Sequence, residues 1–167
     1  MRDFKILFIS LFVTLIISCQ ATTEDAIKYN DGITEQQILV NEKLTVLLDS
    51  YDAYVSEDMD IAYDSALEQL NKSINYVGKL KGFEEDKYFK ESALTFLKIY
   101  KSVLENEHQQ IIQLLKLPED NYGQKEVELV EAHRNISNTK IDKAFEDMFI
   151  TQKKFADKYH IELESEN

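Results

Sequence analysis

The residues with the clearest chemistry in this chain are Ile16-Ile17-Ser18-Cys19, which match a bacterial lipobox. In such a motif the cysteine thiol accepts diacylglycerol, and the small serine before it lets the processing peptidase bring its backbone close to the sulfur. Two basic residues precede a largely apolar run, Ile6 to Ile17, that is too short to cross a membrane as a stable helix. The sequence therefore predicts a lipoprotein signal peptide at residues 1–18 and a mature chain that begins at lipidated Cys19.

Two alternatives stay open for residues 1–18: an uncleaved anchor, or a secretory signal without lipidation that is followed by an incidental cysteine. Cys19 is the only cysteine of the chain. The folded part downstream can therefore contain no disulfide, no thiolate metal site and no cysteine nucleophile. Its stability must come from packing alone.

One pair of residues has metal-ligand spacing. Glu105 and His108 form a Glu-x-x-His pair, but di-iron helical bundles need a second such pair and a glutamate from each of two further helices. His133 and His160 are preceded at three residues by valine and aspartate instead. We therefore expect no dinuclear centre, and no metal ligand or cofactor is assigned. A single divalent cation on the acidic surface stays open, without named ligands.

The sequence lacks the motifs of common enzyme classes. It has no Gly-x-Ser-x-Gly elbow, no phosphate-binding glycine loop and no haem-attachment motif. Acidic pairs such as Glu84 with Glu85, or Glu126 with Glu128, are typical of a solvated helix face. We expect no catalytic residues and a protein that is not an enzyme.

The chain is strongly acidic, with a net charge of −12 at pH 7. Removal of residues 1–18 takes away two basic residues and one acidic residue, which makes the mature chain one unit more negative. Such a field repels nucleic acids and anionic headgroups, and it attracts cations or basic partners. We expect no nucleic-acid binding, and the main role of this charge is to keep tethered molecules soluble.

Helical periodicity dominates the chain after a short tether at residues 19–24. In the first predicted helix, about 25–55, residues recur at spacings of three and four along one stripe. The stripe consists of Ala26, Asn30, Ile33, Gln37, Val40, Leu44, Leu47, Tyr51 and Tyr54, widened by Leu48 and Val55. Its phase continues through the turn-like Asn30-Asp31-Gly32, which favours one continuous helix over a break there. The buried Asn30 and Gln37 are expected to fix helix register through paired side chains, with a ligand contact as the alternative.

Three further helices are predicted at about 57–81, 87–116 and 122–159. The expected boundary residues are Thr22 or Thr23 as the first N-cap, Ser56 as the second, Gly82 as a stop, and Asn121 with Gln124 as a capping box. The inward set of the last helix is Val127, Val130, Ile141, Ala144, Phe145, Met148, Phe149, Phe155 and Tyr159. Residues 161–167 are expected to form an acidic, fraying tail.

These helices predict an all-α fold, an antiparallel up-down four-helix bundle over residues 25–160. Short connections make neighbouring helices run in opposite directions. One proline and four glycines, none in an alternating pattern, give a sheet little support. Six tyrosines fall on or beside the apolar stripes and are expected to pack in the core: Tyr29, Tyr51, Tyr54, Tyr63, Tyr100 and Tyr159.

Three stretches are informative when taken together: Ala26-Ile27-Lys28-Tyr29-Asn30-Asp31, Phe96-Leu97-Lys98-Ile99-Tyr100-Lys101-Ser102-Val103-Leu104-Glu105-Asn106-Glu107 and Gln152-Lys153-Lys154-Phe155-Ala156-Asp157-Lys158-Tyr159. They resemble an uncharacterised family of helical surface lipoproteins associated with leptospires and Bacteroidota. The resemblance covers most of the mature chain and implies a lipid-anchored bundle in the cell envelope. It transfers no catalytic or binding residues.

The sequence predicts a lipid-anchored protein of the bacterial cell envelope, attached to the outer membrane through Cys19, with the periplasmic or external face left open. The leading hypothesis is a non-enzymatic binding or interaction module with an unidentified protein partner. The alternative is a periplasmic carrier that holds an apolar small molecule between its helices, in a cavity lined by residues such as Phe96, Phe145 and Phe149. A purely structural spacer also stays open.

Overall fold

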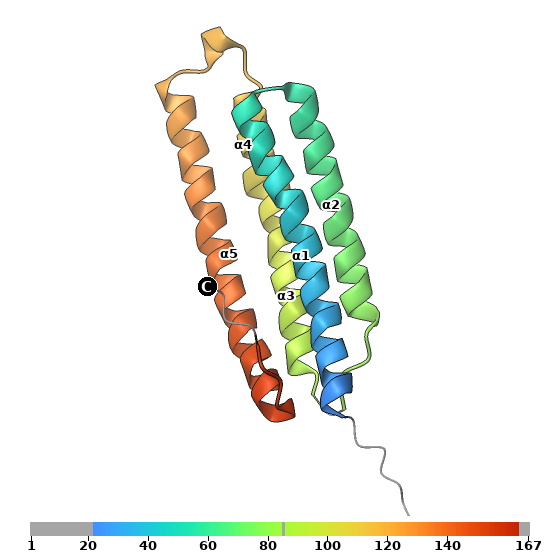
Figure 1. Cartoon of the computed structure of the whole chain (residues 1–167). Helices are drawn as coiled ribbons and strands as arrows, with labels where there is room; N and C mark the ends of the chain where they lie inside the picture. Colours follow the sequence, from blue (N-terminus) through green and yellow to red (C-terminus); the bar gives the residue numbers. More distant parts are fainter. Residues whose placement is uncertain (1–21, 85, 164–167) are drawn as a thin grey trace, which may run out of the picture.

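The computed structural model describes residues 22–84 and 86–163. They form an all-α bundle of four rods that pack against each other and run alternately up and down (Figure 1), as the sequence predicts. The first two rods are α1 (Thr23–Ala53) and α2 (Ser56–Lys79). The third rod joins α3 (Tyr88–Val103), the π-helical turn η1 (Leu104–His108) and α4 (Gln109–Leu115). After the short 3-10 turn η2 (Glu119–Asn121), α5 (Gln124–Tyr159) forms the fourth rod.

The first helix begins with a reciprocal cap at Thr22. The Thr22 hydroxyl accepts a hydrogen bond from the Asp25 backbone N–H, and the Asp25 carboxylate accepts one from the Thr22 N–H, both at 3.1 Å. Two backbone donors that the first turn leaves free are thereby satisfied. The cap confirms one of the two predicted positions, and the predicted tether at residues 19–24 therefore gives way to helix earlier than expected. Cys19 and the predicted signal peptide lie outside the described residues.

Continuity of α1 through Gly32 is confirmed, and the glycine has a packing role. A Cβ atom at Gly32 would lie 3.0 Å from the hydroxyl of Tyr76, a residue of α2. The missing side chain lets the Tyr76 ring lie close against α1. Gly32 therefore serves helix approach and makes no turn.

The predicted ends of α2 are both wrong. Val55 is the N-cap and Ser56 is the first helical residue, without a side-chain cap, while the helix ends at Lys79, before Gly82. At that end, the Lys90 ammonium of α3 donates hydrogen bonds to the carbonyl of Gly78, at 3.0 Å, and to that of Leu80. The Lys90 ammonium thus satisfies carbonyl groups at the C-terminal end of α2 that a C-terminal glycine cap would otherwise satisfy.

The start of α5 differs from prediction, whereas its end at Tyr159 agrees with it. Gly123 is the N-cap and its N–H donates to Glu126 at 3.1 Å, whereas Asn121 belongs to η2. At the other end, the Ile161 N–H donates to the Ala156 carbonyl at 2.9 Å, and Ile161 packs half-buried against the core. Ile161 is therefore fixed by the end of the helix, and the predicted fraying does not begin there. Residues 164–167 lie outside the described residues.

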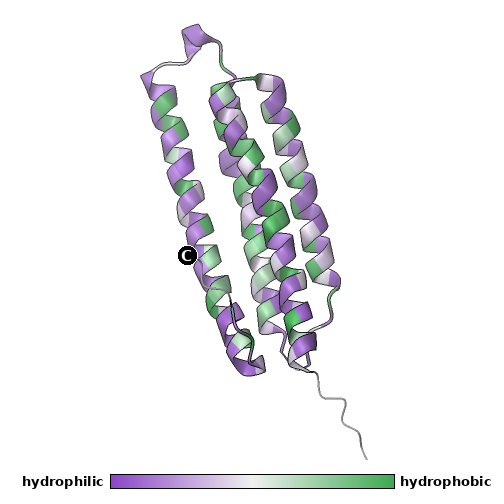
Figure 2. Ribbon diagram, in the orientation of Figure 1, coloured by the Kyte–Doolittle hydropathy of each residue, from purple (hydrophilic) through white to green (hydrophobic). Residues whose placement is uncertain are grey.

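An aromatic cluster fills the end of the bundle where α1 begins and α5 ends. It consists of Tyr29, Phe83, Phe89, Phe155 and Tyr159. Phe83 and Tyr159 meet edge to face, with ring centroids 4.9 Å apart and an interplanar angle of 85°. This geometry is favourable for aromatic quadrupoles. Apolar and polar residues alternate along each rod in Figure 2, as expected of amphipathic helices around a shared core.

A polar pair inside the bundle fixes α1 against α5. Asn30 is buried, and its side-chain oxygen accepts a hydrogen bond from the Gln152 amide at 2.9 Å. This is the paired side-chain contact predicted for Asn30. Gln37 is half-buried rather than buried, and its side-chain amide contacts the sulfur of Met148 in α5. The fully buried amide is that of Gln36, which accepts a hydrogen bond from Ser73 of α2 at 3.1 Å. The buried face of α1 is thus turned toward α2.

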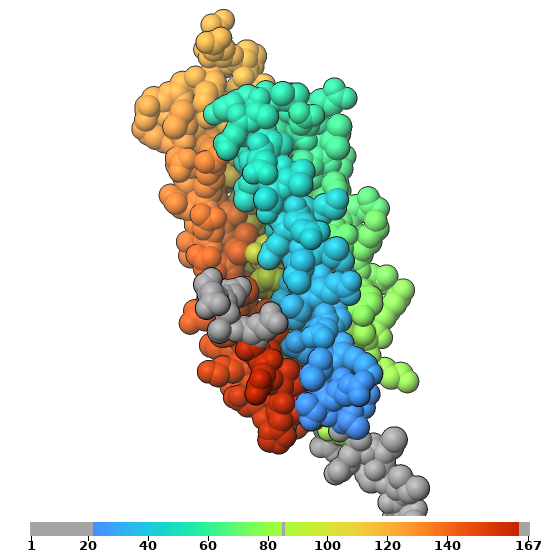
Figure 3. Space-filling model, in the orientation of Figure 1, coloured from blue at the N-terminus to red at the C-terminus, as the bar shows by residue number. Residues whose placement is uncertain are grey.

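The seam between α1 and α5 is the loosest of the bundle. Contacts between α1 and α2 are extensive along their length, whereas contacts between α1 and α5 are sparse. In Figure 3, yellow atoms of the third rod are visible between α1 and α5. Four residues predicted to face the core are consequently exposed: Leu48, Val127, Phe145 and Phe149. Tyr54 and Val55, also predicted to face the core, are exposed because α1 ends at Ala53 and they lie in the connection to α2. A stripe identifies the apolar face of a helix, but only the neighbouring helices decide how much of that face is covered.

Candidate functional site

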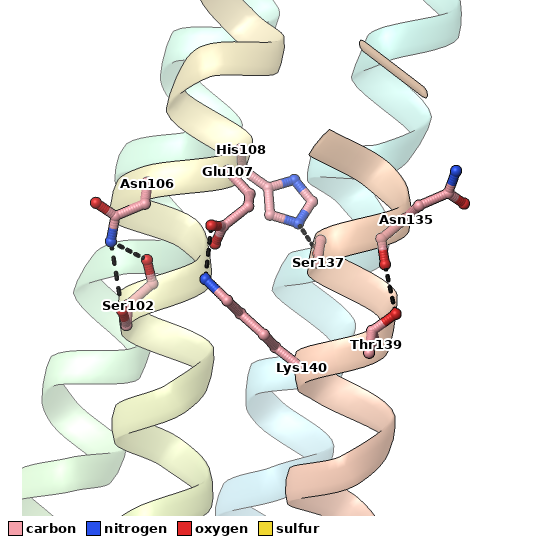
Figure 4. A network of polar contacts seen from close by, with 8 residues as sticks. All are labelled: Ser102, Asn106, Glu107, His108, Asn135, Ser137, Thr139 and Lys140. Atoms are coloured by element: carbon pink, nitrogen blue, oxygen red, sulfur yellow. Dashed lines mark hydrogen bonds and ion pairs between the residues drawn. The ribbon is translucent and has the colours of Figure 1, made fainter. Parts of the chain in front are cut away.

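The third rod contains a π-helical turn, η1, which the sequence did not predict. Turns of this kind are rare and often mark functional sites or strained stretches of helix. In η1 the adjacent residues Glu107 and His108 are both buried, at 8% and 5% exposure. They contact different partners (Figure 4). The turn therefore places two ionisable groups inside the bundle.

The imidazole of His108 bridges the third rod to both α1 and α5. Its Nδ1 lies 2.8 Å from the Tyr51 hydroxyl of α1, and its Nε2 lies 3.2 Å from the Ser137 hydroxyl of α5. The second of these contacts is drawn in Figure 4. Because hydroxyl groups both donate and accept, the pair satisfies either neutral tautomer of the ring.

The surroundings of His108 keep it neutral. Burial, together with the charge of Arg134, outweighs the opposing effect of Glu107 and lowers the pKa of His108 to about 4. Burial also raises the pKa of the Tyr51 hydroxyl. At neutral pH both groups are therefore uncharged, and their contact is a hydrogen bond between neutral partners.

Ser137, His108 and Tyr51 stand in the order of a nucleophile, a base and an orienting group. The arrangement is nevertheless unsuited to acyl transfer. Ser137 is only 2% exposed and lies within α5, where the helix already uses the backbone N–H groups that could stabilise an oxyanion. Burial and Arg134 both disfavour the imidazolium that a general base must become. The network is better explained as a structural link beside a pocket.

That pocket opens at the α1–α5 seam and has a volume of about 280 Å³. Three buried residues, Tyr51, His108 and Ser137, form its floor. The other lining residues, which are exposed or half-buried, are Leu48, Asp52, Arg134 and Asn138. The pocket thus combines one apolar side chain, one carboxylate, one guanidinium and several neutral hydrogen-bonding groups.

On the other side of η1, Glu107 forms an ion pair with Lys140 of α5. The ammonium lies 2.7 Å from one carboxylate oxygen (Figure 4). The other oxygen, Oε2, is buried without a hydrogen-bond partner among the described residues. Since Lys140 is half exposed, solvent screens the pair, and its contribution to the stability of the bundle is small.

The two residues of the Glu-x-x-His pair do not point toward a common site. Glu105 is exposed and its carboxylate lies 3.6 Å from the Lys101 ammonium, whereas His108 faces the interior. Within residues 22–84 and 86–163, no group of three or more histidine, cysteine or acidic residues gathers where it could hold a metal ion. In the same residues, no helix is both long and apolar enough to cross a membrane.

The site must be interpreted from its own geometry. No known protein family, curated protein or solved structure matches this chain. Its function is therefore argued from the residues that line the pocket and from those that the bundle leaves exposed.

A second feature of interest is an exposed aromatic pair on α5. The rings of Phe145 and Phe149 stack with centroids 6.2 Å apart and an interplanar angle of 11°, and the residues are 42% and 46% exposed. Phe96, predicted to line the same apolar cavity, is instead buried against Tyr100, with centroids 4.7 Å apart. The Phe96 ring also contacts that of Phe145, with centroids 6.4 Å apart, so the three phenylalanines form one row that runs from the core to the surface.

Sequence reasoning missed the pocket, although two signals were present. His108 falls within the apolar stripe of the third helix, where a titratable residue needs polar partners from other helices. Arg134 is the only arginine after Arg2, so it supplies the only guanidinium of the folded chain. Neither signal reveals Tyr51 or Ser137, which reach His108 only through the packing of α1 and α5.

Proposed function

We propose that this protein is a non-enzymatic interaction module of the bacterial cell envelope, anchored to the outer membrane by a lipid on Cys19. The observation that carries the binding role is the stacked and exposed pair Phe145 and Phe149. Large aromatic residues left at a surface are enriched where proteins bind each other. Their exposure favours an interaction surface on α5 over an internal cavity.

Two features of the sequence support the anchor: the lipobox itself, and the short stretch of chain between Cys19 and the bundle. Only Gln20 and Ala21 separate Cys19 from the N-cap Thr22. A lipid on Cys19 would therefore hold the aromatic end of the bundle close to the bilayer. The resemblance to helical surface lipoproteins implies the same arrangement, a lipid-anchored bundle in the cell envelope.

The partner proposed for α5 is a protein with a basic surface. Asp142 and Glu146 are exposed beside Phe145, and the whole chain carries a net charge of −12. Opposite charge accelerates encounter and selects partners, while the aromatic pair supplies apolar area to bury. Two copies of the chain, each with a net charge of −12, repel each other, which argues against a second copy as the partner.

The alternative hypothesis, a carrier of an apolar ligand, has less support. That hypothesis requires an enclosed cavity lined by Phe96, Phe145 and Phe149. The Phe96 ring is instead buried against Tyr100 and Phe145, and Phe145 and Phe149 are 42% and 46% exposed. The pocket at His108 is lined mainly by polar groups, which suits a different ligand class.

The anchor is tested by metabolic labelling with a radioactive fatty acid. The natural chain should incorporate label and fractionate with membranes, and Cys19→Ala should lose both properties. Incorporation that persists in Cys19→Ala would contradict the anchor. Protease treatment of intact cells, with a periplasmic protein as leak control, then separates the two faces. Loss of the protein indicates the external face, and protection indicates the periplasmic face.

The interaction surface is tested with a photo-crosslinking amino acid in place of Phe149 in living cells. We expect one discrete adduct with a basic envelope or external protein, which weakens when Phe145→Ser is added. Ile61 of α2, which is 61% exposed, is the matched control position and should give no such adduct. An adduct of two copies of this chain, or equal adducts from both positions, would contradict the proposed surface.

A further inference from the structure

The pocket at the α1–α5 seam has the composition of a small-ligand site. Its volume of about 280 Å³ lies just below the range of about 300 to 1,000 Å³ that holds drug-sized ligands. Its floor is fixed by the contacts of His108 with Tyr51 and Ser137. A rigid floor and a small volume suit a metabolite-sized molecule, because little ordering is needed on binding.

Arg134 gives the pocket a carboxylate-binding group. It is the only arginine in the described part of the chain, and its planar guanidinium can hold a carboxylate through two parallel hydrogen bonds, which a lysine cannot do. Its ion pair with Glu131 is long, at 3.6 Å, and lies on the partly exposed surface of α5. Such a contact leaves the guanidinium donors available to a ligand.

Asp52 gives the opposite charge to the same pocket. It is exposed near the end of α1 and lines the pocket together with Arg134 of α5. A ligand with only a negative charge would be repelled by the net charge of −12 and by Asp52 itself. A ligand with both a carboxylate and an ammonium avoids this repulsion and pairs with both groups.

We propose that the α1–α5 pocket binds a small zwitterion of the α-amino-acid class. Arg134 and Asn138 receive its carboxylate, Asp52 receives its ammonium, and Leu48 contacts a short apolar side chain. This goes beyond the protein-binding role of Phe145 and Phe149, because it uses other residues and needs neither the lipid nor a protein partner.

The test is isothermal titration calorimetry of the full chain in detergent micelles, with the twenty common L-amino acids as probes. We expect at least one small apolar amino acid to bind at micromolar to millimolar concentration. Its N-acetyl derivative, which lacks the ammonium, and its amide, which lacks the carboxylate, should each bind at least about tenfold more weakly. Absence of binding by every amino acid at millimolar concentration would overturn the proposal.

Substitutions of the pocket-lining residues test whether the amino acid binds in this pocket. Binding should weaken at least about tenfold in Arg134→Gln and in Asp52→Asn. Arg134→Lys should weaken binding less than Arg134→Gln does, because lysine keeps the positive charge but lacks the two parallel donors of the guanidinium. Lys143→Gln and Asp49→Asn, which alter exposed charges of α5 and α1 outside the pocket lining, are the matched controls and should bind normally. Both target residues are partly exposed, so the variants should keep the fold, which circular dichroism checks. Normal binding by folded Arg134→Gln and Asp52→Asn would overturn the assignment, and equal binding of the N-acetyl derivative would overturn the zwitterion.

Discussion

The hydroxyl of Tyr51 lies 2.8 Å from Nδ1 of His108, and this hydrogen bond joins α1 to the π-helical turn of the third rod. The two rings also stack, with centroids 6.0 Å apart and an interplanar angle of 28°. Together with Ser137 on the other ring nitrogen, the contact fixes the floor of the pocket where α1 and α5 otherwise meet sparsely.

Loss of the Tyr51 hydroxyl should destabilise the bundle. Tyr51→Phe leaves Nδ1 of a buried imidazole without its partner, and we expect the free energy of unfolding to fall by about 1 to 2 kcal/mol. Tyr54→Phe is the matched control, because Tyr54 is 64% exposed, and its effect should stay within about 0.5 kcal/mol. Urea denaturation followed by circular dichroism measures both. Equal effects at the two positions would contradict the role of the hydrogen bond.

The bundle should lose stability as the pH falls from about 6.5 toward 4. The pKa of His108 is lowered to about 4 in the folded protein, against 6.5 for a free histidine. Between these values the unfolded chain binds the proton and the folded protein does not, so the free energy of unfolding rises with pH across this window. The full contribution of this group is about 3 kcal/mol, present above about pH 6.5 and lost as the pH approaches 4.

Variants separate this effect from the titration of the acidic residues. His108→Gln should flatten the dependence of unfolding free energy on pH between 4 and 6.5, relative to the natural chain, as measured by urea denaturation. His133→Gln, at a half-buried position of α5 outside the pocket lining, should leave the dependence unchanged. A natural chain and a His108→Gln variant with parallel pH profiles would show that His108 does not contribute.

The two glycines within helices should respond differently to alanine. Nothing lies within 4 Å of a Cβ at Gly78, so Gly78→Ala should stabilise the protein by up to about 1 kcal/mol through helix propensity. At Gly32 the new methyl meets the Tyr76 hydroxyl at 3.0 Å, and moving this ring should cancel part of the gain. Thermal denaturation should show a larger gain for Gly32→Ala in a Tyr76→Phe background than in the natural chain. An unchanged gain would argue against the contact.

Core and surface phenylalanines should differ strongly in their effect on stability. Phe96→Ala removes a ring that is 2% exposed and should cost about 3 to 5 kcal/mol, whereas Phe149→Ala, at 46% exposure, should cost less than about 1 kcal/mol. Denaturant midpoints of the two variants make the comparison. A large loss at Phe149 would mean that the ring supports the core, which would weaken its proposed role as a binding surface.

Local sequence determined the helices of this protein and some of their caps. Thr22 and Asp25 cap α1 because the two residues are adjacent on one helical turn, and the stripe continued through Gly32 because its phase did not change. The buried amide Asn30 could be identified from its position in that stripe. Such features depend on residues a few positions apart, which a helix brings together by its own geometry.

The tertiary structure alone decided the pocket and the exposed aromatic pair. Tyr51 and Ser137 reach His108 from other helices. Local sequence patterns do not predict how α1 and α5 are rotated about their axes to bring these residues there. Phe145 and Phe149 lie on an apolar stripe, yet the distance between α1 and α5 leaves them exposed. The period of a stripe fixes which face of a helix is apolar, but the closeness of neighbouring helices depends on side-chain packing across the whole bundle.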